Sequence, residues 1–331
     1  MKEKEIILGI DVSKASLDIC ILINNQTELR RIKNNTKTIK SFISKVLKQN
    51  QGFRIVVCME NTGYYNWPCL EAFEGIEMDL FVVNPLHLKN SMGLVRGKTD
   101  SIDATRIAKF ILLHKENLKQ TLIPRKQIRV MQALLAQRNR LVETKKKFSV
   151  PTAELVFIAD KELSKKVEQS SKKIIKQIET QIIAVEAQLN ELIANDEDLK
   201  QQYQFITSVQ GVGKVLAWTM LVKTNEFKSI NNPRKLACYA GVVPFEFKSG
   251  TSIYKRPRVS FMADKTLKKL LHLSALRVIQ LKGELQSYYQ RKVSEGKNKM
   301  LVLNAIRNKL VARICSTINN KKMYEINLHL S

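Results

Sequence analysis

Short apolar segments separated by polar residues characterise the first third of the chain. Runs at residues 5–11 and 17–23 are rich in β-branched side chains, and residues 27–33 alternate more weakly. Together they predict an antiparallel meander. Helical spacing then alternates with strand-like runs, and the expected order is helix 38–48, strand 53–59, helix 64–73, strand 80–83 and helix 101–113. Because strands and helices alternate, we expect an α/β domain over residues 1–123.

Longer helical patterns follow a break at Pro124. Residues 128–142 have helical spacing and are basic, and a second stretch repeats apolar residues at alternating spacings of three and four: Ile175, Ile178, Ile182, Val185, Leu189 and Leu192. This is the a/d pattern of a coiled coil, sustained for only about three heptads. It fits a coiled coil within or between chains, or a helix packed on its own domain. We favour a coiled-coil region over residues 124–200.

The final segment, residues 201–331, is predicted to be a mostly helical domain. Helical patterns occupy residues 215–222, 232–239, 264–280 and 298–317, whereas residues 245–258 read as a polar, basic excursion. A Gly-x-Gly turn at Gly211 and Gly213 precedes the first of these helices. Such a turn can direct backbone N–H groups at a phosphate, or it can simply connect two helices.

Charge favours a polyanionic partner. The 331 residues include 56 Lys and Arg against 30 Asp and Glu, a net charge of +26. No basic amphipathic helix with an aromatic face points to a membrane surface, so nucleic acid is the expected partner. Several cations gather in the middle of the chain, where they would contact backbone phosphates without reading sequence: Arg138, Arg140, Lys145, Lys146, Lys147, Lys165, Lys166, Lys172 and Lys173.

Cysteine and histidine usage argues against a structural zinc site. The five cysteines are scattered, none in a Cys-x-x-Cys pair, and the four histidines are dispersed. The chain lacks an apolar run long enough to span a bilayer, and its start does not resemble a secretion signal. We therefore expect reduced thiols and a cytoplasmic, bacterial protein without membrane contact.

Four acidic residues stand out against this basic background. Asp11 and Glu60 each end a predicted strand, and Asp100 and Asp103 lie three residues apart at the start of a predicted helix. Such placement can bring carboxylates from distant segments together to hold two divalent cations, which would offset charge on a phosphodiester. The alternative is that Asp100 caps the helix and Asp103 complements its dipole. Asp18 alternates away from its apolar neighbours and is expected to be solvated.

The segments around these residues resemble a known family. The first domain contains Gly9-Ile10-Asp11-Val12-Ser13-Lys14, Met59-Glu60-Asn61-Thr62-Gly63-Tyr64-Tyr65 and Arg96-Gly97-Lys98-Thr99-Asp100-Ser101-Ile102-Asp103-Ala104. The last domain contains Gly211-Val212-Gly213, Leu236-Ala237-Cys238-Tyr239-Ala240-Gly241-Val242-Val243-Pro244 and Lys248-Ser249-Gly250-Thr251. In this order the motifs resemble those of the IS110-type transposases, and the resemblance covers almost the whole chain.

The resemblance implies a RuvC-like N-terminal domain of the ribonuclease-H fold and a DNA recombinase that moves an insertion element. It implies that Asp11, Glu60, Asp100 and Asp103 bind Mg²⁺ and that Ser249 attacks a phosphodiester. It also implies a guide RNA encoded by the element and a homo-oligomer. We expect this oligomer to be a dimer to tetramer that assembles through the coiled coil. We further expect a set of cations to bind nucleic acid: Arg96, Lys98, Lys214, Lys255, Arg256 and Arg258.

Two other functions fit the residues. In a RuvC-like junction nuclease the acids would activate water, and Ser249 would have no role. In a non-catalytic nucleic-acid-binding protein the acids would only cap helices. Without the family resemblance, nothing in the sequence selects Ser249 over Ser252 or Ser260, because a serine beside glycine in a loop is typical of an ordinary turn.

Overall fold

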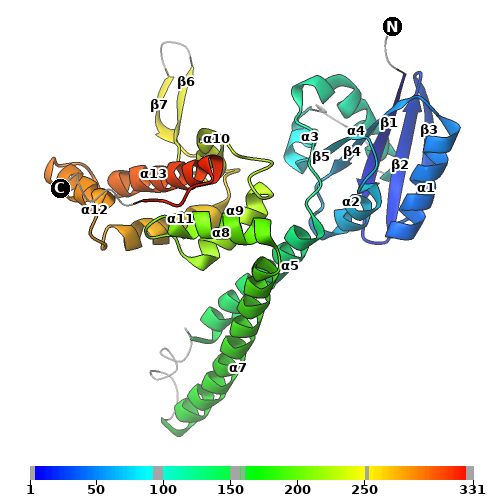
Figure 1. Cartoon of the computed structure of the whole chain (residues 1–331). Coiled ribbons are helices and arrows are strands. Elements are labelled where there is room, and N and C mark those ends of the chain that lie inside the picture. Colours follow the sequence, from blue (N-terminus) through cyan, green and yellow to red (C-terminus); the bar gives the residue numbers. More distant parts are fainter. Residues whose placement is uncertain (1–3, 92–99, 150–156, 158–160, 250–252, 326–331) are drawn as a thin grey trace. The chain divides into compact units, whose positions relative to one another are not determined.

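The computed structural model describes residues 4–91, 100–149, 157, 161–249 and 253–325. Within them the chain forms two compact units, residues 1–123 and 124–331 (Figure 1). A further division of the second unit at residue 200 stays a prediction.

The first unit is built on a mixed five-stranded sheet of order β3-β2-β1-β4-β5. Its elements are β1 (Glu5–Val12), β2 (Ser16–Ile23), β3 (Gln26–Lys33), α1 (Thr36–Gln49), β4 (Arg54–Glu60), η1 (Gly63–Asn66), α2 (Trp67–Phe73), β5 (Asp79–Val83), α3 (Pro85–Ser91), α4 (Asp100–His114) and η2 (Lys115–Asn117). Strands β1, β2 and β3 pair antiparallel, which confirms the predicted meander, whereas β4 pairs parallel to both β1 and β5. The α/β class predicted from the alternation is confirmed.

Helices cover both faces of this sheet, so its central strands are apolar on both sides. One face packs against α1 and α2 through residues such as Ile43 and Phe73. The other face packs against α4 through Ala104, Ile107 and Ile111. Burial on two faces explains why β1, β2 and β4 read as almost continuous apolar runs.

The second unit is mostly helical, as predicted. Its elements are α5 (Lys126–Ser149), α7 (Lys161–Ala194), α8 (Glu197–Ser208), α9 (Lys214–Thr224), α10 (Pro233–Tyr239), β6 (Phe245–Ser249), β7 (Ile253–Arg258), α11 (Lys265–Val278), α12 (Glu284–Ser294) and α13 (Lys299–Asn320). The predicted polar excursion is a two-stranded antiparallel hairpin, β6 and β7. Phe245 and Phe247 stand two residues apart, as apolar residues of a strand do, but the many charged residues around them concealed this alternation in the sequence.

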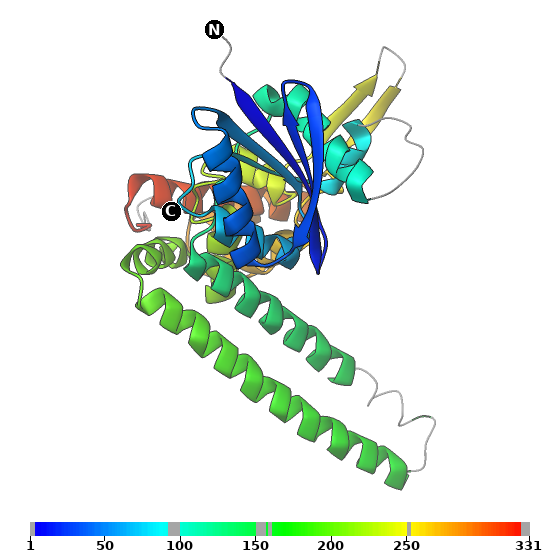
Figure 2. The ribbon, with the colours of Figure 1, turned by 90° about the vertical axis from the view of Figure 1, so that its right-hand side faces the viewer.

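Helices α5 and α7 run side by side in opposite directions (Figure 2). Arg138 pairs with Glu186 at 2.7 Å and Lys145 with Glu179 at 2.6 Å, which fixes this antiparallel register. Val185 and Leu189 of the a/d pattern are buried in the same core as Leu135 of α5. The apolar seam therefore has a partner within its own chain, and an intermolecular coiled coil stays a prediction.

Within the described part of the chain, no helix combines the length and apolar character needed to cross a membrane.

The α5–α7 packing predicts a contrast between two residues of α7. Leu189 is fully buried, whereas Ile183 on the same helix is 68% exposed. We expect Leu189→Ala to lower the free energy of unfolding of the second unit by about 2–5 kcal/mol, because it leaves a cavity in the core. Ile183→Ala should change it by less than about 0.5 kcal/mol. Urea unfolding followed by circular dichroism measures both, and equal effects would contradict the burial of the seam.

Candidate functional site

The ends of β1 and β4 bring two carboxylates to one edge of the sheet. The parallel register places Ile10 opposite Met59, so Asp11 and Glu60 follow on adjacent strands, about 5 Å apart along the hydrogen-bonding direction. Alternation along each strand puts both residues on the face that α4 covers, because Ile7 of β1 and Val56 and Cys58 of β4 belong to the core beneath α4. The sequence prediction that these residues share a sheet edge is in this respect confirmed.

Gly9 allows α4 to lie directly on β1. A Cβ atom at this position would come within 2.3 Å of the Ala108 nitrogen and 2.4 Å of the Ala104 carbonyl oxygen. No side chain fits there, because the obstacle is the backbone of α4. This contact fixes the N-terminal turn of α4, which carries Asp100 and Asp103, on the face that carries Asp11.

The four acids form one electrostatic group around Asp11. The pKa of Asp11 rises from 3.8 to about 6, first because the carboxyl is partly buried and then because Asp100, Asp103 and Glu60 repel its negative charge. Like charges held together raise each other's cost of ionisation, and a cation placed among them relieves it. The sequence did not reveal which of the four acids would be the most perturbed.

Two arginines and a fifth acid border this group. Arg106 donates to Asp103 at 2.7 Å from one turn farther along α4, and Arg31 of β3 lies 3.9 Å from Asp100 and 3.7 Å from Asp18. The prediction that Asp18 is solvated is wrong, since only 8% of it is exposed. It lies opposite Asp11 in the antiparallel register, and alternation alone could not show that α4 covers this face.

A buried amide shapes the loop that follows Glu60. Asn66 is 2% exposed, donates to the Glu60 carbonyl oxygen at 2.8 Å and accepts from the Thr62 backbone N–H at 2.8 Å. The side chain thereby fixes the direction in which the chain leaves β4. Sequence reasoning missed Asn66, Arg31 and Arg106. For the close contact at Gly9 a sequence signal does exist, because an isolated glycine inside a strand indicates that another backbone approaches closely.

Carboxylate oxygens are the donors that a hard divalent cation such as Mg²⁺ prefers, so the chemistry of this group fits the predicted metal. Its spacing is wider than a ready-made site, because among the described residues no three acidic, histidine or cysteine side chains lie close enough to hold one ion. Metal binding would therefore require the carboxylates to move together, with Asp103 exchanging its pairing to Arg106 for the ion.

The remaining predicted residues fall outside this group. Ser249 is the last residue of β6, with its backbone opposite Ile253 of β7, and Lys255, Arg256 and Arg258 belong to β7. Lys214 begins α9 and pairs with Glu186 at 2.6 Å. Arg96 and Lys98 lie outside the described residues.

Comparison with known proteins gives two family matches. Residues 8–150 match a DEDD-type IS110 family model described as transposase, and residues 203–290 match the model described as transposase of the IS116/IS110/IS902 family. The first match contains all four acids, and the second contains Ser249.

Individual relatives point in the same direction. The chain is similar to the pilin gene-inverting proteins of Moraxella bovis and Moraxella lacunata, each 24% identical over 97% of this chain and 98% of the relative. It is also similar to an uncharacterized 43.6 kDa protein of insertion element IS110 from Streptomyces coelicolor. That protein is 28% identical over 43% of this chain and 34% of its own length.

Gly9→Ala tests the contact that positions α4. The added methyl group meets backbone atoms, so we expect it to destabilise the first unit by about 3 kcal/mol, at the upper end of overpacking effects. Adding Ala108→Gly should fail to restore stability, because the Ala108 nitrogen and the Ala104 oxygen remain in place. Thermal unfolding measures both variants, and full rescue by the second substitution would contradict the backbone contact.

Asp11→Asn tests the electrostatic group through the pH dependence of stability. Folding raises the pKa of Asp11, so its charge destabilises the fold as pH rises through about 6 and has no such effect well below 3.8. In EDTA, the variant should therefore gain more in melting temperature over the wild type at pH 8 than at pH 5. A difference that is the same at both pH values would contradict the raised pKa.

Proposed function

The chain belongs to the IS110 family of transposases and is an enzyme of DNA recombination, and from this premise we propose how it acts on DNA. It cleaves and rejoins DNA strands to move or invert a DNA segment. The pilin gene-inverting relatives support the choice of recombination between DNA segments. The observation that carries the proposal is the gathering of four carboxylates from β1, β4 and α4 around Asp11 in a chain of net charge +26.

In this proposal the first unit has a RuvC-like fold and holds the divalent metal. The mixed sheet with helices on both faces is compatible with that fold. Mg²⁺ bound by Asp11, Glu60, Asp100 and Asp103 would offset the charge that builds up on the scissile phosphate. Asp11 must release its proton to bind a cation, and the repulsion from its three neighbours is the free energy that binding would relieve.

Ser249 is the proposed nucleophile of the second unit. Its Oγ loses its proton to solvent and forms a bond to the scissile phosphorus while the bond from phosphorus to the 3′ oxygen breaks, and the 3′ oxygen leaves with the electron pair and takes up a proton from solvent. The protein is then joined to the 5′ phosphate, and the reverse attack by a 3′ hydroxyl rejoins DNA and frees the serine. The position of Ser249 within the second family match supports this role, as does the basic composition of β7 beside it.

The proposal also includes an RNA guide encoded by the element and a homo-oligomer. The family resemblance supports both, and the excess of 26 positive charges would accommodate a second nucleic acid besides DNA. Base pairing by a guide would supply sequence specificity without base-reading side chains.

Ser249→Ala separates recombination through serine from hydrolysis. With element-end DNA, its guide RNA and Mg²⁺, the wild type should form a covalent protein–DNA adduct that persists on denaturing gels. Ser249→Ala should abolish the adduct, whereas Ser260→Ala, a matched change beyond β7, should retain it. Asp11→Asn should stop strand cleavage itself. Cleavage by Ser249→Ala at the wild-type rate would contradict the serine mechanism and favour a nuclease that activates water.

A further inference from the structure

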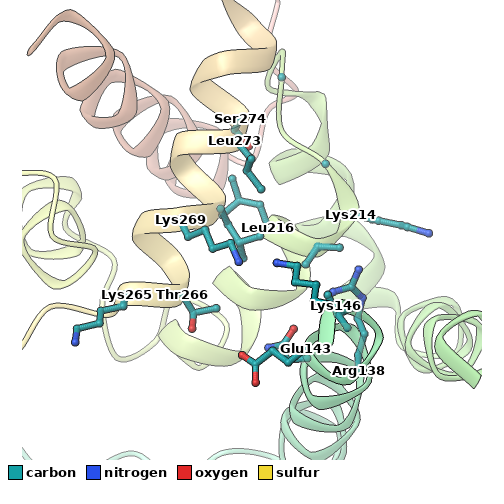
Figure 3. A pocket seen from close by; sticks show the side chains of 16 residues that line it. Arg138, Glu143, Lys146, Lys214, Leu216, Lys265, Thr266, Lys269, Leu273 and Ser274 are labelled. Atoms are coloured by element: carbon teal, nitrogen blue, oxygen red, sulfur yellow. The ribbon is translucent and has the colours of Figure 1, made fainter. Parts of the chain in front are cut away.

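A basic pocket of about 680 Å³ lies within the second unit, between α5, α9 and α11 (Figure 3). Glu143 is the one acidic residue of its lining. The cationic lining residues come from all three helices: Arg138, Lys146, Lys214, Lys265 and Lys269. A volume of this size lies within the range of ordinary ligand sites.

Two of these cations already have a partner. Arg138 and Lys214 both pair with Glu186 of α7, at 2.7 Å and 2.6 Å. Their charge is thus partly neutralised within the protein, and they help to hold α5, α7 and α9 together.

Lys146 and Lys269 differ from them. Neither amino group lies within ion-pair distance of a carboxylate among the residues that the structure describes, and Glu143 makes no ion pair with either. Figure 3 shows Lys146 on α5 and Lys269 on α11 extending toward the same space. Two like charges directed from separate helices into one hollow repel each other, so an anion between them would be stabilised by both.

The lining of the pocket is partly apolar. Leu216 is almost fully buried at its floor, and Leu270 and Leu273 of α11 line its side. Lys146 and Lys269 are both exposed to solvent, so their attraction for an anion comes from two charges acting together rather than from exclusion of water. Lys265 and Thr266, nearer the start of α11, add further polar groups to the lining.

We propose that this pocket binds the sugar–phosphate backbone of a nucleic acid, with Lys146 and Lys269 contacting its phosphate groups. The inference deepens the proposed function by naming a contact surface remote in sequence from the four acids, and it rests on that function only in taking nucleic acid as the ligand. A guide RNA and a DNA duplex present the same backbone chemistry, and the experiment distinguishes them.

The test compares Lys146→Ala/Lys269→Ala with a control of equal charge change, Lys235→Ala/Lys299→Ala, at exposed lysines outside the pocket. Affinity for a fluorescent single-stranded RNA and for a DNA duplex is measured by anisotropy in EDTA at several salt concentrations. We expect the pocket variant to lose about tenfold or more in affinity for at least one of the two. The slope of log affinity against log salt should become shallower by about 1.4 for the single strand or 1.8 for the duplex, as expected for two lost phosphate contacts.

Lys146→Arg/Lys269→Arg should bind within about threefold of the wild type, since it keeps both charges, and matching melting temperatures would show that the variants are folded. The nucleic acid whose binding is weakened in the pocket variant, single-stranded RNA or DNA duplex, is thereby identified as the ligand. Losses no greater than those of the control variant in both arms would overturn the proposal. Because EDTA removes the metal, that failure would leave the chemistry proposed for the four acids untouched, and loss of cleavage tests that chemistry separately.

Discussion

The contact between α4 and β1 at Gly9 is the constraint on which the acidic group depends. Backbone atoms of α4 occupy the space where any side chain at position 9 would begin, so the helix lies as close to the strand as the chain permits. The first turn of α4 carries Asp100 and Asp103, and β1 carries Asp11 two residues beyond Gly9. Apolar packing of Ile107 and Ile111 against the sheet stabilises an arrangement that electrostatics alone would oppose.

The raised pKa of Asp11 reflects the burial of its carboxyl and the repulsion between its charge and those of the neighbouring acids. A protein gathers carboxylates at such a cost where a function requires it, and perturbed acids are typical of catalytic and metal sites. The neighbouring Arg31 and Arg106 offset part of the charge, and exchanging them for a divalent cation would bring the carboxylates closer together. The four acids are thus held near one another by the fold.

The sequence predicted the five strands of the first unit, most of the helices and the shared sheet edge because their signals are local, but it missed the β6–β7 hairpin and the helices α3, α8 and α12. Apolar runs identify β1 and β4, and the ends of those runs locate Asp11 and Glu60. The burial of Asp18, the pairing of Arg31 with acids from two elements and the pocket at Lys146 and Lys269 depend on contacts between distant segments. A helical period likewise showed that α7 has an apolar seam, but it could not show that α5 of the same chain covers part of it.

Calorimetric titration with Mn²⁺, a divalent ion that prefers the same oxygen ligands as Mg²⁺ and generally binds more tightly, tests most directly whether the four acids act as one cation site. The wild type at pH 8 should bind one or two ions per chain, as a two-metal carboxylate group would. Asp11→Asn should lose that binding, while Asp198→Asn, which removes an exposed carboxylate of α8, should keep it. Equal Mn²⁺ affinity in the wild type and in Asp11→Asn would contradict the central role of the acidic group.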